Sequence, residues 1–464
     1  MTTPKRLKSS FQKYIPKDLN DLQKKAMESV LIGNSVFITG GAGTGKSFVL
    51  RAIINALRLQ GRKLLITAST GVAARNIGGK TIHSECGYIN GLHAVYDLLN
   101  PGHNVRNLEV KDQDDSVIKA MEKTAIENKN KLIARLKTNN DYCEKWRTCD
   151  VLIVDEISMI DEITLEFFHS VLCRIRGSKH PFGGLQVVFC GDFLQLQPVK
   201  GDFAFGALTW HCLNMETFDL QEIVRQTDSV FKKNLSDVRE GRISNDFINL
   251  LNRNVDEFIE ECNGIVPFHL TSTVAETEAL NLKYLRDMKS KIVRFYAIDT
   301  YTKDFSHSTF SAKLQCMVGK DVSICIGAPV MMLKNTEHYV NGSFGRVLKI
   351  DAVNKRVTVK LLDSKKTHIL CPMDFEITST SGEKLGIRNA FPFQVAFATT
   401  IHKCIGLTLE KIIVHCDNLF TEAQVYVALS RVRDIKDVCT IGLLPEHVKA
   451  SERALGFYKD LIDN

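Results

Sequence analysis

The chain has 464 residues, of which 44% are hydrophobic and 24% charged, a length and composition that allow about three domains with their own cores. Its 60 Lys and Arg against 53 Asp and Glu give a net charge of +7, which fits a polyanionic partner without establishing one. The 13 cysteines form no Cys-x-x-Cys pair, and no apolar run is long enough to span a membrane. This pattern argues against a disulfide framework, a zinc site and a membrane protein.

The first seventeen residues carry five basic side chains and no acidic one. A nuclear address, a transit peptide and a solvated basic arm all fit this composition. We expect an intracellular protein in a reducing compartment, with the nucleus as its site, or the host nucleus for a viral protein.

Six short β-branched runs alternate with helical stretches, as is typical of buried parallel strands in α/β domains. They are residues 35–39, 63–67, 151–154, 185–190, 411–415 and 437–441. Four lie before residue 195 and two after residue 410, which predicts two sheets.

Hairpin-rich β structure is predicted between the two sheets. Residues 322–333 and 345–362 have strand composition, with turn signals at Asn341-Gly342 and at residues 351–355. These segments indicate a small β-barrel inserted in the second α/β domain. Residues 107–147 are strongly charged and are expected to form an accessory subdomain or a solvated insertion.

A glycine-rich segment, Gly40-Gly41-Ala42-Gly43-Thr44-Gly45-Lys46-Ser47, lies between a predicted strand and an apolar helical stretch. Its glycines let successive backbone N–H groups wrap a polyphosphate, and the next helix directs its positive end at the same charge. In this motif Lys46 reaches the β- and γ-phosphates, and the Ser47 hydroxyl holds Mg²⁺. The segment predicts ATP and Mg²⁺ as cofactors.

Two later strands end in polar residues, at the sheet edge where ligands bind in open α/β folds. Asp155 and Glu156 follow residues 151–154, and Gln195 comes shortly after residues 185–190. We expect Asp155 to hold Mg²⁺ and Glu156 to polarise the attacking water. Gln195 is expected to contact the γ-phosphate or that water and so to sense hydrolysis.

These residues resemble those of superfamily 1 helicases. The sequences of the motifs resemble, more narrowly, the petite-integration-frequency (Pif) type of 5′-to-3′ DNA helicase. The resemblance runs from residue 19 to about residue 444, with the motifs in the family's order. The similar segments are residues 19–23, 67–74, 79–84, 155–161, 183–186, 220–226, 391–403 and 426–431.

The resemblance implies roles for particular residues. Arg225 and Arg431 would be arginine fingers that reach the γ-phosphate from the second domain. The implied catalytic set is Lys46, Glu156, Gln195, Arg225 and Arg431. The implied nucleotide-binding set is Gln23, which would read adenine, with Gly40, Gly41, Ala42, Gly43, Thr44, Gly45, Lys46 and Ser47. Ser47 and Asp155 would be the metal ligands, and the implied DNA-binding set is Thr70, His83, Thr400, His402 and Lys403.

The chain departs from the family pattern at two places. Cys404-Ile405 stands where a Ser-Gln pair is usual before Gly406, and Gln197 replaces the first of two prolines before Val199. We expect the first change to affect a polar contact that couples the strand-binding motif to the ATP site, and the second to matter less.

The resemblance implies an α/β fold of two RecA-like P-loop NTPase domains, with a wedge subdomain and an inserted SH3-like β-barrel. We expect the first RecA-like domain at residues 1–214, with the wedge within about 85–145. The second is expected at residues 215–295 and 388–464, and the barrel at residues 296–387.

The predicted function is an ATP-dependent 5′-to-3′ DNA helicase that moves on single-stranded DNA and unwinds forked or tailed duplexes. DNA replication, recombination, repair and telomere or genome maintenance are the processes that fit. RNA–DNA hybrids and four-stranded DNA stay open as substrates, and we expect a monomer, with further copies recruited by DNA. Two alternatives stay open: an ATP-driven RNA or protein-displacing translocase, and a non-catalytic nucleic-acid-binding relic.

Overall fold

The computed structural model describes residues 14–85, 140–198, 201–262, 266–301, 317–339, 341–362, 364–378 and 384–463. The chain divides into two compact units, residues 1–223 with 461–464, and residues 224–460. In the ranges just given, no helix is both long enough and apolar enough to cross a membrane. The predicted wedge falls largely on residues 86–139, outside the described part of the chain.

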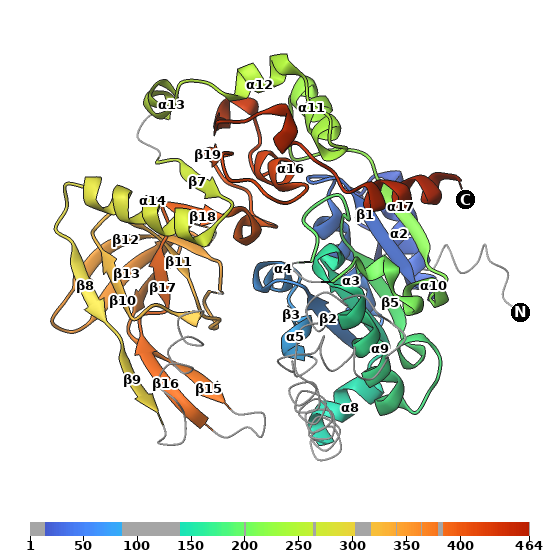
Figure 1. Ribbon diagram of the computed structural model, residues 1–464. Coiled ribbons are helices and arrows are strands. Elements are labelled where there is room, and N and C mark those ends of the chain that lie inside the picture. The colour runs from blue at the N-terminus through green and yellow to red at the C-terminus, as the bar shows by residue number, and fades with distance from the viewer. Residues whose placement is uncertain are drawn as a thin grey trace, which may run out of the picture. The chain divides into compact units, whose positions relative to one another are not determined.

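The first unit is built on a six-stranded parallel sheet with the order β3-β2-β4-β5-β1-β6 (Figure 1). Its strands are β1 (Val36–Gly40), β2 (Leu64–Ala68), β3 (Lys80–Thr81), β4 (Val151–Asp155), β5 (Gln186–Cys190) and β6 (Glu216–Leu220). Its helices are α2 (Asp21–Ile32), α3 (Lys46–Leu59), α4 (Gly71–Asn76), α5 (Ile82–Glu85), α8 (Asn140–Thr148), α9 (Glu162–Arg176) and α10 (Leu208–Cys212).

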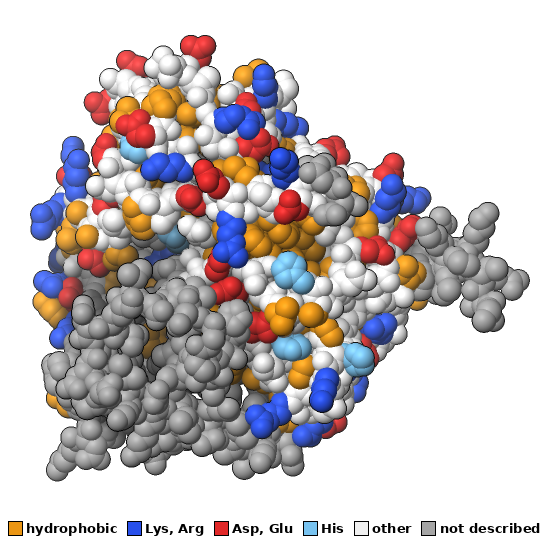
Figure 2. Space-filling model, turned by 45° about the vertical axis from the view of Figure 1, so that its right-hand side comes forward, with side chains coloured by type: hydrophobic (Ala, Val, Ile, Leu, Met, Phe, Trp, Pro, Cys, Tyr) orange, Lys and Arg blue, Asp and Glu red, His pale blue; other side chains and the backbone are white. Residues whose placement is uncertain are grey.

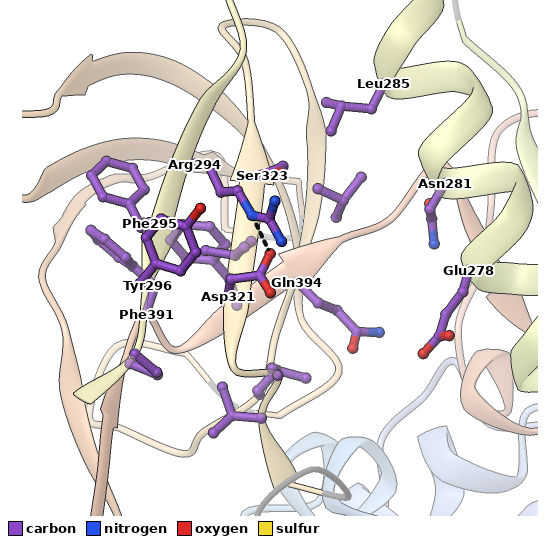
Figure 3. Close-up of a pocket in the computed structure, with 18 of the residues that line it drawn as sticks. Glu278, Asn281, Leu285, Arg294, Phe295, Tyr296, Asp321, Ser323, Phe391 and Gln394 are labelled. Carbon is purple, nitrogen blue, oxygen red and sulfur yellow. Dashed lines mark hydrogen bonds and ion pairs between the residues drawn. The ribbon is translucent and has the colours of Figure 1, made fainter. Parts of the chain in front are cut away.

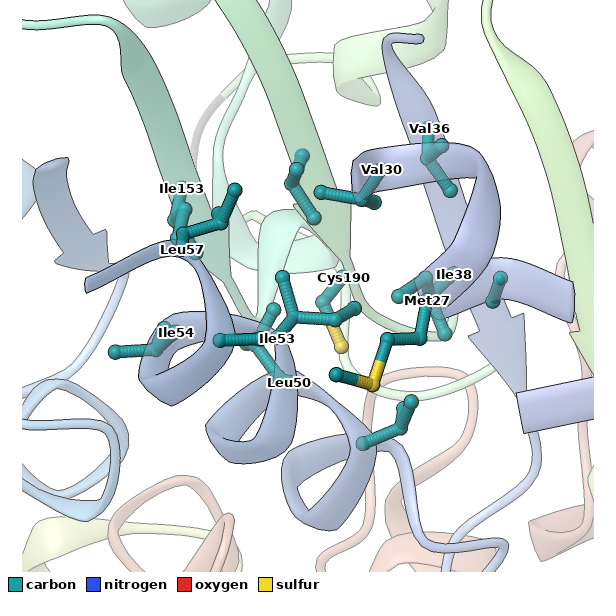
Figure 4. Close-up of a cluster of buried hydrophobic side chains, with 14 of the residues drawn as sticks. Met27, Val30, Val36, Ile38, Leu50, Ile53, Ile54, Leu57, Ile153 and Cys190 are labelled. Atoms are coloured by element: carbon teal, nitrogen blue, oxygen red, sulfur yellow. The ribbon is translucent and has the colours of Figure 1, made fainter. Parts of the chain in front are cut away.

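The core of the first unit fixes the position of α3 against the sheet. Leu50, Ile53 and Leu57 recur at helical spacing and are fully buried, so one face of α3 lies against the apolar strands. Figure 4 shows these side chains gathered with Met27 of α2 and Ile38 of β1. Because β1 and α3 are both held by this core, the loop that joins them has fixed ends.

The first unit extends further than expected. It ends at Ile223 rather than at residue 214, because β6 pairs in parallel with β1 and completes the sheet. The pairing runs from Val36 with Glu216 to Gly40 with Leu220. The sequence pattern missed this strand because its polar residues interrupt the apolar run.

The second unit contains a four-stranded parallel sheet with the order β18-β7-β19-β20. Its strands are β7 (Phe268–Thr271), β18 (Ala398–Thr400), β19 (Ile412–His415) and β20 (Val438–Ile441). The helices are α11 (Ser229–Arg239), α12 (Asn245–Leu251), α13 (Val255–Glu261), α14 (Val274–Asp287), α16 (Gln424–Leu429) and α17 (Glu452–Asp463), of which α17 has its last three residues in the first unit. The six predicted parallel strands are thus present and lie in two sheets, as expected.

The second unit also contains antiparallel strands, in sheets ordered β14-β13-β12-β11-β17, β15-β16-β9 and β10-β8. They are β8 (Val293–Tyr296), β9 (Ile298–Tyr301), β10 (Asp321–Ile324), β11 (Pro329–Met332), β12 (Phe344–Asp351), β13 (Arg356–Leu361), β14 (Thr367–Leu370), β15 (Met373–Thr378), β16 (Lys384–Ala390) and β17 (Phe393–Val395). These strands run from Val293 to Val395, beyond the limits of 296 and 387 that were expected for the inserted barrel. The difference arises because β8 pairs with β10 and β17 pairs with β11.

Candidate functional site

The glycine-rich loop between β1 and α3 has a backbone that only glycine adopts readily. Gly40, Gly43 and Gly45 have φ angles of 131°, 83° and 86°. A Cβ on Gly40 would lie 2.3 Å from the Leu220 carbonyl oxygen, so the neighbouring β6 also excludes a side chain there. Gly45 precedes α3 and offers no side-chain cap, which leaves the first N–H groups of the helix to bind an anion.

Two side chains fasten this loop. The Lys46 ammonium donates to the carbonyl oxygens of Gly40 at 2.7 Å and Gly41 at 2.9 Å. The Gln23 amide group donates to the Thr44 carbonyl at 3.3 Å, and its oxygen accepts the Asn20 backbone N–H at 3.1 Å. Gln23 is buried, and its role in reading adenine stays a prediction. Ser47 is half-buried in the first turn of α3.

The acidic pair stands at the C-terminal end of β4. Asp155 is 2% exposed, and its Oδ1 accepts the Glu156 backbone N–H at 2.9 Å. Burial raises the pKa of Asp155 to about 7, the Glu156 carboxylate pushes it the same way, and the nearby Lys46 ammonium opposes both. Glu156 has φ of 53°, a left-handed conformation that is strained for a residue with a side chain. Such strain is characteristic of functional residues.

Gln195 is held by a buried aspartate beyond β5. Asp192 is fully buried, and its Oδ2 accepts the Gln195 side-chain N–H at 3.2 Å. Because β4, β5 and β1 are neighbours in one parallel sheet, their C-terminal ends meet at one edge. The structure therefore brings the phosphate loop, the acidic pair and Gln195 to the same edge of the first unit.

The two predicted fingers lie together in the second unit. The Arg225 guanidinium donates to the Ser430 carbonyl oxygen at 2.9 Å. Arg431, 2% exposed, donates from Nε to the Val427 carbonyl at 2.8 Å and from Nη2 to the Ser430 hydroxyl at 2.7 Å. Residues that are distant in sequence thus share Ser430 as a partner.

Three predicted DNA-binding residues lie at the end of β18 and directly after it. Thr400 is the last residue of the strand, and His402 and Lys403 lie in the short 3₁₀ helix Ile401–Cys404. Burial lowers the pKa of His402 and of Lys403, and for Lys403 the Glu278 carboxylate opposes this shift. Lys403 nevertheless has an exposed side chain, so its ammonium is accessible to an anion.

The other two predicted DNA-binding residues belong to the first unit. The Thr70 hydroxyl accepts the Ala73 N–H at 3.2 Å and so caps α4, while its own hydrogen can still be donated. His83 lies in α5, and its side chain is outside the described part of the structure.

The departure from the family pattern at Cys404-Ile405 is an apolar substitution inside the fold. Cys404 is fully buried and Ile405 is 3% exposed, and the Cys404 thiol donates to the Ile401 carbonyl at 3.0 Å. Both side chains therefore pack inside the second unit.

A cavity of about 700 Å³ lies in the second unit beside Thr400 and Lys403. Figure 3 shows Glu278 and Asn281 of α14 on one side and the paired Arg294 and Asp321 of β8 and β10 on the other. The Asn281 side chain exchanges two hydrogen bonds with the Ala398 backbone, at 2.9 and 3.1 Å, and so fastens α14 to β18. Sequence reasoning missed Asn281, since nothing in its local pattern marks a residue that contacts a strand over a hundred positions away.

Comparison with known proteins identifies the family. A family model described as an AAA domain matches residues 18–260. The chain is 30% identical to "ATP-dependent DNA helicase Pif1" of Bdellovibrio bacteriovorus, covering 95% of this chain and 92% of that protein. The chain belongs to the Pif1 helicase family. It is 31% identical to "ATP-dependent DNA helicase PIF1" of Xenopus laevis over 96% of this chain, and it spans about 64% of that relative's length.

Solved Pif1 structures support the same assignment. Bacteroides Pif1 in complex with ADP-AlF3 and single-stranded DNA superimposes with a TM-score of 0.73 at 25% identity, covering 97% of this chain and 98% of that one. The Pif1 relationship confirms the predicted α/β fold with a RecA-like P-loop domain.

Proposed function

We propose that the chain is an ATP- and Mg²⁺-dependent helicase that moves 5′ to 3′ on single-stranded DNA and unwinds forked or tailed duplexes. The observation that carries the proposal is the single sheet edge that holds the phosphate loop, Asp155, Glu156 and Gln195. A Pif1 relative in complex with ADP-AlF3 and single-stranded DNA supports both the nucleotide and the strand. The direction rests on the family.

The residues around the phosphate loop fit a bound magnesium nucleotide. The Ser47 hydroxyl and the buried Asp155 carboxylate supply the oxygen ligands that Mg²⁺ prefers. When bound, Mg²⁺ would neutralise phosphate charge. Lys46 would exchange its loop carbonyls for phosphate oxygens, and Glu156 would accept a proton from the attacking water. Gln195, aligned by Asp192, would orient that water, and Arg225 and Arg431 would stabilise the charge that develops on the γ-phosphate.

Strand binding would rest on particular residues, since the charge of the protein is nearly balanced. Figure 2 shows acidic and basic side chains interspersed over the described part of one face, in line with a net charge of only +7. Thr70, Thr400, His402 and Lys403 offer hydroxyl and N–H donors for the sugar-phosphate backbone, whose recognition is independent of sequence.

The antiparallel strands of the second unit are proposed to form the SH3-like barrel, and residues within about 85–145 the wedge.

The test is the ATPase rate with and without single-stranded DNA, together with unwinding of 5′-tailed and 3′-tailed duplexes. We expect DNA to stimulate hydrolysis and only the 5′-tailed duplex to open. Lys46→Ala should lower hydrolysis about 10²- to 10³-fold, because it removes a preorganised phosphate ligand. Arg51→Ala, an exposed residue on the same helix, is the matched control and should leave the rate unchanged.

Two other outcomes would redirect the proposal. Hydrolysis stimulated equally by RNA would favour the RNA or protein-displacing translocase, because phosphate contacts alone do not distinguish the 2′-OH. Strand binding without hydrolysis would favour the non-catalytic relic. The proposal also includes action in the nucleus, action on RNA–DNA hybrids or four-stranded DNA, and a monomeric protein. The processes that fit it are DNA replication, recombination, repair and telomere maintenance.

A further inference from the structure

Ser430 links the two arginines that are proposed to act on the γ-phosphate. It follows α16 directly and is fully buried. Its carbonyl oxygen accepts hydrogen bonds from Arg225 at 2.9 Å and from the Gln226 side chain at 3.4 Å. Its hydroxyl accepts from Arg431 at 2.7 Å and donates to the Val427 carbonyl at 2.9 Å. One residue therefore contacts both guanidinium groups.

Gln226 strengthens the connection between the two segments. It is 1% exposed, and its side-chain nitrogen also donates to the Val432 carbonyl at 2.8 Å. Arg225 and Ser430 are 205 positions apart, so these bonds join segments that the chain itself does not hold together. We call Arg225, Gln226, Ser430 and Arg431 the arginine clasp.

The clasp restrains Arg431 without using all of its donors. A guanidinium has five N–H groups, and the Nε and Nη2 atoms of Arg431 are engaged with Val427 and Ser430. The Val427 carbonyl lies near the C-terminal end of α16, where the helix dipole favours a positive charge. Charge-assisted hydrogen bonds inside a buried network are stronger than neutral ones and leave few alternative arrangements. The remaining N–H groups are thereby presented in one orientation.

We propose that Gln226 and Ser430 are positioning residues that hold Arg225 and Arg431 as one unit, so that both reach and leave the γ-phosphate together. The proposal rests on the proposed ATPase function. It goes further, because it makes the second arginine's placement depend on the first. Neither Gln226 nor Ser430 needs to touch ATP for this role.

Removing the Ser430 hydroxyl is the direct test. In Ser430→Ala the acceptor for Arg431 Nη2 is lost, while the carbonyl that binds Arg225 stays. We expect kcat for DNA-stimulated ATP hydrolysis to fall about tenfold, the cost of one hydrogen bond to a charged group, with little change in KM or in DNA affinity.

The matched control removes a buried hydroxyl elsewhere in the same unit. Thr440 is 2% exposed, and its hydroxyl donates to the Asn252 side chain at 2.7 Å. Thr440→Val should lower the melting temperature by a similar amount and leave kcat unchanged. A loss of kcat in both variants would reduce the effect to general destabilisation and overturn the proposal.

A double-mutant cycle separates positioning from packing. If Ser430 acts through Arg431, Ser430→Ala should have almost no further effect on kcat in an Arg431→Lys background. If Ser430→Ala lowers kcat by the same factor in the wild-type and Arg431→Lys backgrounds, the proposed role of the clasp would be overturned. A second cycle leaves Ser430 intact and measures Gln226→Leu in the wild-type and Arg225→Lys backgrounds. This cycle still tests the proposal if Ser430→Ala does not fold.

The cycle also distinguishes this inference from the function on which it rests. A wild-type protein that does not hydrolyse ATP, or hydrolysis untouched by Arg431→Lys, would overturn the arginine-finger role and the clasp with it. Hydrolysis that depends on Arg431 but is indifferent to Ser430→Ala and Gln226→Leu would overturn the clasp alone.

Discussion

The two units hold their proposed functional groups in different ways. In the first, Asp155 and Glu156 follow a strand directly, and Gln195 is fixed within a few residues of the next strand by Asp192. In the second, Arg225 and Arg431 lie in different segments and are held by carbonyl and hydroxyl groups at the end of a helix. Strand register places the first set, whereas contacts between distant segments place the second.

Burial also acts on opposite charges in the two units. It raises the pKa of Asp155 in the first unit and lowers the pKa of His402 and Lys403 in the second, because a low-dielectric setting disfavours the charged form of every group. Anionic phosphates and a cation would relieve these costs. We therefore expect mutations near Asp155, Glu156 and Gln195 to disturb the placement of these side chains less than mutations near Arg225 and Arg431 disturb the placement of the two arginines.

The largest expected effect tests the arginines of the second unit. Arg431→Lys keeps the charge but not the planar fork, so it cannot reproduce the bonds to Val427 and Ser430. We expect kcat to fall about 10³-fold or more in single-turnover hydrolysis. Arg433→Lys, an exposed neighbour, is the control. Retention of the wild-type rate would move transition-state stabilisation to the first unit alone.

Next in size is the loss of the acidic group in the first unit. Glu156→Gln keeps the volume and removes the base, so kcat should fall about 10²-fold or more while ATP still binds. Equilibrium binding of a fluorescent ATP analogue and hydrolysis, measured side by side, check both parts. Glu144→Gln on α8 is an exposed control. Loss of binding together with hydrolysis would show that the strained residue at 156 supports the loop structure instead.

A smaller effect is expected from the strand-binding residues. Lys403→Ala should weaken single-stranded DNA binding and reduce the slope of log affinity against log salt by about 0.7, the value for one phosphate contact on a single strand. Hydrolysis without DNA should not change. Lys436→Ala, which removes an exposed lysine of the same unit, is the control. An unchanged salt slope in Lys403→Ala would place the strand elsewhere.

The smallest effect concerns stability of the second unit. His269 Nδ1 and His415 Nε2 are 2.9 Å apart, and the Tyr284 ring lies 4.4 Å from the His269 ring. Burial lowers the pKa of His269 to about 3, and the positive charges of His415 and Lys283 add to this. The native state thus binds a proton less readily than the unfolded state, so stability is lost as pH falls below the ordinary value of 6.5.

The loss should reach at most about 1.4 kcal/mol for each pH unit between 6.5 and 3. Urea unfolding between pH 7 and pH 5 measures it, with His269→Gln as the comparison because glutamine does not titrate. A shallower pH dependence in His269→Gln is expected. Equal dependence in both proteins would assign the effect to other groups.

The sequence by itself determined the chemistry that depends on local order. The phosphate loop, the acidic pair and the six apolar strands are contiguous patterns, and their geometry follows from glycine freedom and from strand alternation with helices. Each was predicted because the residues that make it are neighbours in the chain.

Tertiary structure decided what depends on residues far apart. The pairing of β6 with β1 places β6 in the first unit. Hydrogen bonds of Asn281 join α14 to β18, and Ser430 binds both Arg225 and Arg431. Family resemblance could name the two arginines, but not their common partner. No local pattern records such contacts, because they arise only when separate segments pack together and their buried polar groups must find hydrogen bonds.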